Sequence, residues 1–302
     1  MDRKIVKRSL KVGITLAVAA LGTEVALIAY PPLAGAAFWL RSAPGAQCNA
    51  TETIHSAAYH REYDRLHKQI VDSVRLVQQD GNLQLWNIPN MREFWILGSF
   101  NDMNALAFAE QAAGQYRHPS VHFQPGDIVL DVGADYGSVT YEALKAGAQK
   151  VIAIEIAPEK WPCLERTFAK EIAEGRVVLL RQGAWDSEST LELGGDSVVL
   201  ERGSQKQKVR VTTIDQMVLE LKLPRVDFIT MDIEGAEKPA LRGAVNTLKK
   251  FRPRMAIASE HLPDDTVAIP KTVHAMVPEY EAICGQCNLV DRKLLAQVIW
   301  FK

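Results

Sequence analysis

The sequence predicts an α/β fold: a doubly wound, mostly parallel sheet with an antiparallel strand pair at one edge. From Gln124 onward, apolar runs of strand length alternate with helical patterns. These runs lack the strict alternation of strands that have one wet face, so both faces of the sheet should be covered. The last two apolar runs, YEAICG and LLAQVIWF, follow each other without a helix between them. They predict the antiparallel edge.

Length and composition describe a folded chain with a sizeable core. The 302 residues are 47% hydrophobic and 24% charged. The net charge is -1, with no basic block outside the extreme N-terminus, which argues against a nucleic-acid partner. The four cysteines are too few for a disulfide scaffold. Cys284 and Cys287 form a CxxC near a terminal strand, read either as two ordinary thiols or as a metal or redox pair.

The first forty residues differ from the rest and predict a membrane anchor. The basic stretch MDRKIVKRSLK precedes nineteen mostly apolar residues, Val12 to Tyr30. A span needs about twenty such residues, so this run is barely long enough, and it contains Glu24. A signal peptide cleaved near Ala34-Gly35-Ala36 and a buried apolar hairpin are the alternatives. We expect residues 1–40 to be basic flank and anchor, 41–82 linker and amphipathic helix, and 83–302 one domain.

The orientation of that anchor is open to two opposing arguments. A basic flank favours a cytoplasmic N-terminus, so a single span would place the domain outside. A re-entrant hairpin turning at Pro31-Pro32, or an interfacial helix, would keep the domain on the cytoplasmic side. We expect the cytoplasmic placement, because the small-molecule cofactor identified below is a cytosolic metabolite.

Local patterns predict the elements in chain order. The predicted helices lie within 51–79, 138–146, 159–173, 215–221, 236–248 and 269–276. The predicted strands are LQLWNI, the apolar part of PGDIVLDVG, the runs at 151–156 and 177–180, VDFITMDI and MAIASE. Between Ser189 and Thr213 the alternation in TLEL, SVVLE and KVRV predicts a β insertion.

A glycine-rich loop after the first strand of the alternating region predicts a ligand site. VLDVGADYGSVT places Gly133 and Gly137 where the backbone can approach a ligand closely, ahead of a helix N-terminus. The fingerprint G-x-G-x-x-G is absent, and Asp131 stands where its first glycine would be. An acid there suits a cationic amino group and sulfonium, and Glu155 ends the next strand, where it can bind both ribose hydroxyls. The prediction is S-adenosylmethionine, against a simple packing loop.

With these residues in view, the sequence resembles the FkbM family of S-adenosylmethionine-dependent methyltransferases. The resemblance rests on DVGADYGSVT, VIAIEIAPEKW and the run VTTIDQMVLELKLPRVDFITMDIEGAEKPALRGA, with the lead-in FWILGSFNDMNALAFAEQAAGQY and the tail AIASEHLPDDTVAIP. It spans residues 83–302. Asp135 departs from it, since the family usually has Asn there. The resemblance implies a class I methyltransferase (Rossmann-like) fold and methylation of a hydroxyl oxygen on a sugar or natural product.

The carboxylates of MDIEGAE are the predicted catalytic residues. Asp232 ends a strand beside the glycine loop, and His261 follows the next strand, so either can take the proton of an acceptor hydroxyl. Glu234 is a further candidate. For Glu234 and Glu237 the alternative is charge complementing a helix N-terminus. We expect no resident metal, although a divalent cation held by these acids and His261 is the rival mechanism.

The sequence thus predicts a membrane-anchored enzyme that methylates a hydroxyl of a glycan, lipid or small metabolite. Ala184 and Trp185, after the third strand, are expected to line the adenine slot. A cofactor-binding scaffold of the same fold that has lost catalysis is the alternative, suggested by Asp135 alone. A dehydrogenase is disfavoured by the missing glycine fingerprint.

Overall fold

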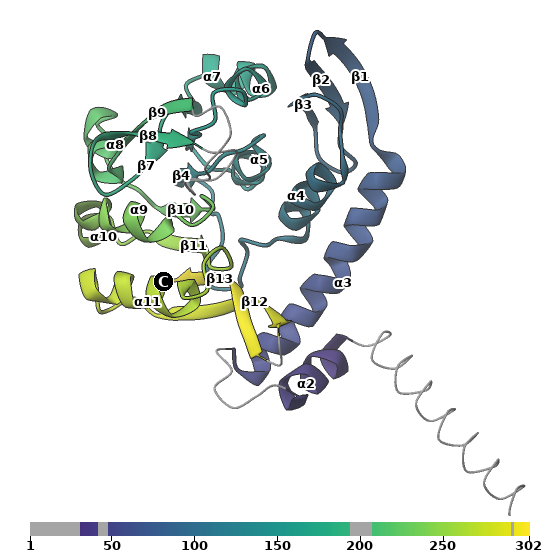
Figure 1. Ribbon diagram of the computed structural model, residues 1–302, viewed down its shortest axis with the longest axis vertical. Helices are drawn as coiled ribbons and strands as arrows, with labels where there is room; N and C mark the ends of the chain where they lie inside the picture. Colours follow the sequence, from purple (N-terminus) through teal and green to yellow (C-terminus); the bar gives the residue numbers. More distant parts are fainter. Residues whose placement is uncertain (1–30, 42–47, 194–206, 291–292) are drawn as a thin grey trace, which may run out of the picture.

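The computed structural model describes residues 31–41, 48–193, 207–290 and 293–302. Its central strands are β4 (Ile128–Val132), β5 (Lys150–Ile154), β6 (Val177–Leu180), β10 (Phe228–Met231), β11 (Arg254–Ala258), β12 (Ala282–Val290) and β13 (Lys293–Phe301). They form one seven-stranded sheet in the order β12-β13-β11-β10-β4-β5-β6 (Figure 1). All pairs from β11 to β6 are parallel, while β13 is antiparallel to both β11 and β12. The predicted sheet and its antiparallel edge are confirmed.

Helices connect and cover these strands. They are α5 (Ser138–Lys145), α6 (Trp161–Thr167), α7 (Ala169–Ala173), α8 (Ile214–Glu220), α9 (Glu237–Arg242), α10 (Val245–Phe251) and α11 (Asp265–Met276). The predicted helix over 236–248 is split at Gly243, where a Cβ atom would lie 2.0 Å from the Trp185 carbonyl oxygen. The helix predicted over 159–173 is likewise two short helices, α6 and α7.

A small second sheet follows β6. It contains β7 (Gly183–Ala184), β8 (Ser189–Leu193) and β9 (Gln207–Thr212), with β9 in the middle. β8 and β9 are antiparallel, as the predicted β insertion requires. The run SVVLE, which also belonged to that prediction, lies outside the described residues.

The N-terminal elements lie along one flank of the sheet (Figure 1). They are α2 (Pro31–Arg41), α3 (Ala50–Ser73), β1 (Arg75–Asp80), β2 (Leu83–Asn87), β3 (Glu93–Leu97) and α4 (Asp102–Ala113). The helix predicted over 51–79 was too long, because it ends at Ser73 and RLVQQD forms β1. This segment pairs with β2 across a turn at Gly81, whose φ of 61° suits glycine, and the pairing overrides the helical spacing of its apolar residues.

These elements share one apolar core with the sheet. Leu66 and Ile70 of α3 pack with Phe94 of β3 and Phe108 of α4, and the same cluster contains Phe168 next to α6. Because α3 and β3 hold α4 from behind, one face of α4 is fixed against the carboxyl ends of the strands. This placement matters for the site below.

Among the residues that the structure describes, no helix has both the length and the apolar character that a bilayer crossing requires. The apolar run Val12 to Tyr30, on which the predicted membrane helix rests, lies outside those residues.

Candidate active site

A cavity of about 660 Å³ opens at the carboxyl ends of β4, β5, β10 and β11. Its volume falls in the range of roughly 300–1,000 Å³ that is usual for small-molecule sites. The chain runs outward from β4 through β5 and β6 and later returns to the other side of β4 as β10, so the strand order reverses at β4. Ligands of open α/β sheets bind at such a switch point. The other wall is α4, which contributes Asn104, Ala107, Glu110 and Gln111.

The two loop glycines are required by protein packing, and of the two only Gly133 also lines the cavity. Gly133 has a φ of 92°, and a Cβ atom there would lie 1.9 Å from the backbone oxygen of Asp232. Gly137 has a φ of 91°, and its Cβ would lie 2.2 Å from the Phe168 ring. Gly133 lines the cavity, but its missing side chain serves chiefly to bring the loops after β4 and β10 together.

Asp131 is a buried carboxylate on the cavity wall. It accepts hydrogen bonds from the hydroxyls of Thr140, at 2.6 Å, and Thr230, at 3.2 Å. Burial raises its pKa to about 7, and nearby Glu155 adds to that rise. A cationic ligand group beside Asp131 would stabilise its ionised form, which burial disfavours.

Glu155 fixes the glycine loop to the end of β5. Its two carboxyl oxygens accept the backbone N–H groups of Asp135, at 2.7 Å, and Ala157, at 2.8 Å. Each oxygen keeps a second lone pair, so ribose hydroxyls can still donate to it. Burial raises the Glu155 pKa to about 7. Asp135 has a φ of 47°, which Asp tolerates, and its carboxylate pairs with Lys160 at 2.7 Å.

Ala184 and Trp185 also line the cavity, and their place beside an adenine ring stays a prediction. The residues around the cavity thus include the carboxylates of Asp131 and Glu155 together with apolar surface from Ile154, Ile156 and Ala184. This set of donors and surfaces matches S-adenosylmethionine, which carries an ammonium group, a sulfonium, a ribose diol and an adenine ring. The site fits the cofactor that the sequence predicts.

Asp232 also lines the cavity, directly after β10. Its carboxylate accepts a hydrogen bond from the Tyr116 hydroxyl at 2.7 Å and lies 3.3 Å from Nε2 of His261. Burial raises its pKa above the usual Asp value, and the carboxylates of Glu237 and Asp135 act in the same direction. A raised pKa makes the carboxylate a stronger base once it is ionised.

His261 is surrounded by carboxylates. Its Nδ1 lies 3.1 Å from Oε1 of the fully buried Glu237, and its Nε2 lies 3.7 Å from Glu234. Burial alone would lower the His261 pKa, but the contacts with Glu237, Asp232 and Glu234 outweigh it and raise that pKa to about 9. His261 is therefore a cation at neutral pH. Glu237 also accepts the Ile233 N–H at 2.9 Å, so it is more than a charge at the start of α9.

The same residues are the ones that a divalent cation would use. Ligand atoms of Asp232, Glu234 and His261 lie within 4.8 Å of one another, as do those of Glu237, His261 and Asp265. A protonated imidazole has no lone pair for a metal, so His261 would have to lose its proton first. Proton and metal are thus alternative occupants of this histidine.

The acids predicted from the sequence line this cavity, but several of their neighbours were not predicted. Tyr116 ends the lead-in segment GQY, and Glu110 comes from α4. Glu260 stands beside His261 and accepts from Gln297 at 2.9 Å. Lys160 lies within the quoted run EIAPEKW, so a motif signal existed for it, whereas Glu110 had none.

Comparisons with known proteins find one family model and several solved structures similar to this chain. Residues 131–284 match the family model of the methyltransferase FkbM domain. The structure resembles a methyltransferase FkbM from Methylobacillus flagellatus KT, with 16% identity and a TM-score of 0.51, covering 89% of this chain and 58% of that one. Fibrillarin from Aeropyrum pernix, solved with natively bound S-adenosyl-L-methionine, has 12% identity and a TM-score of 0.41, covering 76% and 98% of the two chains. A search of curated proteins finds no match.

Proposed function

The chain belongs to the FkbM family of S-adenosylmethionine-dependent methyltransferases, and on that premise we propose that it methylates a hydroxyl oxygen of a glycan, lipid or small metabolite. The observation that carries the proposal is the position of Asp232, which faces the cavity beside the glycine loop with Tyr116 and His261 in contact. A hydroxyl acceptor must lose a proton during transfer, and this carboxylate can take it.

The cofactor, when bound, supplies an electrophilic methyl group on a sulfonium. Asp131 and Glu155 bind and orient it, and Asp232 aligns the acceptor hydroxyl and accepts its proton at a carboxyl oxygen. His261 acts as the charged partner of Asp232, since its pKa of about 9 leaves no free nitrogen to act as a base at neutral pH. Glu237 holds that histidine in its charged form and in place.

The acceptor end of the cavity favours a neutral or cationic substrate. Glu110, Glu234 and Glu260 line it together with Asp232, while Lys160 and His261 are the cations among its described lining residues. Burial raises the Glu110 pKa to about 8, so this carboxyl group can donate a hydrogen bond at neutral pH. Phosphate or carboxylate groups on the acceptor would meet uncompensated negative charge here, whereas sugar and alcohol hydroxyls would find acceptors.

The alternative of an inactive scaffold finds no support at this site. It rested on the extra negative charge of Asp135 in the cofactor loop. Lys160 pairs with that carboxylate, so Asp135 adds no unpaired negative charge to the loop. Asp131, Gly133 and Glu155, which a working cofactor site needs, line the cavity, whereas Gly137 precedes α5 and is not among the lining residues.

We also propose that the N-terminal segment attaches the protein to a membrane with the catalytic domain on the cytoplasmic side, where the methyl donor is made. The support is the basic flank and apolar run of the sequence. Protease protection in sealed vesicles tests this placement. Digestion of the domain from the cytoplasmic face is expected, and protection from that face would overturn it.

The test of the proposed chemistry is Asp232→Asn. This change keeps the shape of the side chain and an acceptor for Tyr116, but removes the base. Once a panel of sugar and lipid alcohols has given an acceptor, turnover should fall by about 10²- to 10⁴-fold while S-adenosylmethionine affinity stays near normal. Asp264→Asn is the matched control, because Asp264 is exposed and pairs with Lys238 away from the cavity. Full turnover by Asp232→Asn would refute the assignment.

A further inference from the structure

Three cysteines from opposite ends of the chain meet at the start of α3. Cys48 precedes α3, and Cys284 and Cys287 belong to β12. The Cα atom of Cys48 lies 5.4 Å from that of Cys284 and 6.6 Å from that of Cys287, and both separations fall in the roughly 4.4–6.8 Å range of disulfides. The sulfurs of Cys284 and Cys287 are 3.7 Å apart and not bonded to each other. A sulfur can form only one disulfide at a time, so two pairings compete for Cys48.

The backbone of β12 is shaped to bring its two cysteines to the same place. Side chains three positions apart in a regular strand point to opposite faces. Gln286 interrupts that alternation with a φ of 51°, a left-handed conformation that is uncommon for a residue other than glycine. The Cys287 carbonyl is held in this arrangement by the Ser56 hydroxyl, at 3.0 Å, and by the His60 ring, at 3.1 Å. Both of these residues come from α3.

We propose that Cys48, Cys284 and Cys287 form a thiol–disulfide exchange site in which Cys48 is the shared partner. The thiolate of Cys287 attacks the Cys48 sulfur of a Cys48–Cys284 disulfide. The Cys48–Cys287 bond forms, the Cys48–Cys284 bond breaks, and Cys284 leaves as a thiolate. No electrons are gained or lost in this step, and the reverse step is the same reaction from the other side.

The first disulfide requires an external oxidant, namely a small-molecule or protein disulfide. Two thiols of the cluster lose two electrons and two protons to it, and it is reduced to two thiols. In a reducing compartment such a bond is transient, as disulfides there usually are, so the site does not require the domain to leave the cytoplasmic side.

The free thiol moves between a buried and a more accessible position during exchange. Cys48 and Cys287 are 1% and 5% exposed, whereas Cys284 is only partly buried. External thiols should therefore enter at Cys284. Either disulfide joins the start of α3 to β12, and α3 packs against α4, the helix that forms one wall of the active-site cavity. The cross-link therefore joins α3, the helix that packs behind α4, to β12 at the edge of the sheet.

A zinc site is the main competing explanation of three clustered thiols. Structural zinc sites have four protein ligands. The candidate group here consists of the three cysteines alone among the residues that the structure describes. The His60 ring contacts the Cys287 carbonyl instead of the sulfurs. We therefore favour exchange, and bound zinc is an outcome that would overturn it.

Disulfide mapping of the full chain tests the proposal. The protein is purified without reductant, quenched in acid with an alkylating agent, digested and analysed by mass spectrometry. We expect both Cys48–Cys284 and Cys48–Cys287 peptides, with the remaining cysteine of the pair alkylated. A single fixed pairing, three free thiols, or one zinc ion per chain by elemental analysis would each refute the exchange site.

Single variants provide a second readout and keep one cross-link, which protects the fold. Cys284→Ser should contain only the buried Cys48–Cys287 bond, and Cys287→Ser only the Cys48–Cys284 bond. Dithiothreitol should reduce the former roughly tenfold more slowly, because both of its sulfurs are shielded. Cys163→Ser is the matched control, since Cys163 is a buried free thiol elsewhere and its loss should change neither map nor rate. Equal reduction rates in the two variants would contradict the assignment of Cys284 as the entry point.

Discussion

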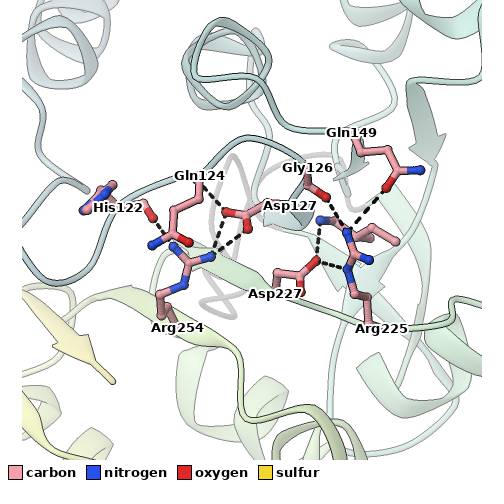
Figure 2. A network of polar contacts seen from close by, with 9 residues as sticks. His122, Gln124, Gly126, Asp127, Gln149, Arg225, Asp227 and Arg254 are labelled. Atoms are coloured by element: carbon pink, nitrogen blue, oxygen red, sulfur yellow. Dashed lines mark hydrogen bonds and ion pairs between the residues drawn. The ribbon is translucent and has the colours of Figure 1, made fainter.

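At the amino end of the central sheet carboxylates face arginines, whereas at the carboxyl end they face a cavity. Asp127, just before β4, pairs with Arg254 at 2.7 Å, and Asp227, just before β10, pairs with Arg225 at 2.7 Å (Figure 2). Asp131, four positions after Asp127, accepts hydrogen bonds from two hydroxyl groups and forms no ion pair with any residue that the structure describes. Both acids are buried, Asp127 immediately before β4 and Asp131 within it.

The presence or absence of an arginine partner separates carboxylates that stabilise the fold from carboxylates that are suited to bind a ligand. Asp127 also accepts the Gln124 N–H at 2.7 Å, so its carboxylate is stabilised by hydrogen bonds and an ion pair within the protein (Figure 2). Burial raises the pKa values of Asp131 and Glu155 to about 7. A carboxyl group whose pKa rises on folding destabilises the fold once it ionises, so both groups reduce stability as the pH rises from about 4 through 7. A cationic ligand would relieve that cost.

The largest expected effect is at the amino end. Asp127→Ala would leave Arg254 without its partner, and only 18% of the Arg254 side chain is exposed. Breaking a buried pair in this way costs about 3–5 kcal/mol, so the free energy of unfolding in urea should fall by that amount. Asp227→Ala should cost less, because Arg225 is about half exposed and better solvated when unpaired. Equal losses would break the distinction between the two pairs.

At the carboxyl end Glu155→Ala should weaken S-adenosylmethionine binding by roughly 1.5–3 kcal/mol, the usual value of hydrogen bonds to a charged group. Because the Glu155 pKa is about 7, wild-type affinity should also decline as the pH falls below 7 and the carboxylate protonates. Isothermal titration calorimetry at several pH values measures both effects. Affinity that is insensitive to the change and to pH would remove Glu155 from the cofactor site.

The smallest expected effect is at Glu237. Glu237→Gln removes one of the carboxylates that keep His261 charged, so the His261 pKa should drop from about 9 by about one unit, worth roughly 1.4 kcal/mol. Turnover at pH 7 should stay near normal, while the alkaline limb of the pH–rate profile moves to lower pH. The charged histidine stabilises the fold below about pH 6.5, and this contribution is lost as the pH rises through 9. An unmoved limb would mean that His261 does not set it.

The sequence predicted the sheet and the acids at its edge for a shared physical reason. Strand ends can be read from where an apolar run stops, and parallel strands bring those ends together. Asp131, Glu155, Asp232 and His261 each follow or end such a run, and all four line one cavity. The antiparallel edge followed equally from two apolar runs without an intervening helix.

Contacts between distant segments could not be read in the same way. Tyr116 reaches Asp232 across 116 positions, and Cys48 reaches Cys284 across 236, with no pattern in the chain to link them. The predicted C-terminus of α3 was wrong for a related reason. Residues 75–80 form β1 because they pair with β2, and the spacing of apolar residues within the segment does not reveal that partner. Lys160 was visible in a motif, but its neutralisation of Asp135 required the folded geometry.

Asp131 and Asp127 provide the most direct test, because the same substitution can be made just before β4 and near its carboxyl end. S-adenosylmethionine is titrated calorimetrically into Asp131→Asn and Asp127→Asn at a temperature where both are folded. We predict that Asp131→Asn binds at least about tenfold more weakly, the loss expected for one hydrogen bond to a charged group, while Asp127→Asn binds like the wild type. Unchanged affinity in Asp131→Asn, or an equal loss in both variants, would contradict the division of the sheet into a structural end and a ligand-binding end.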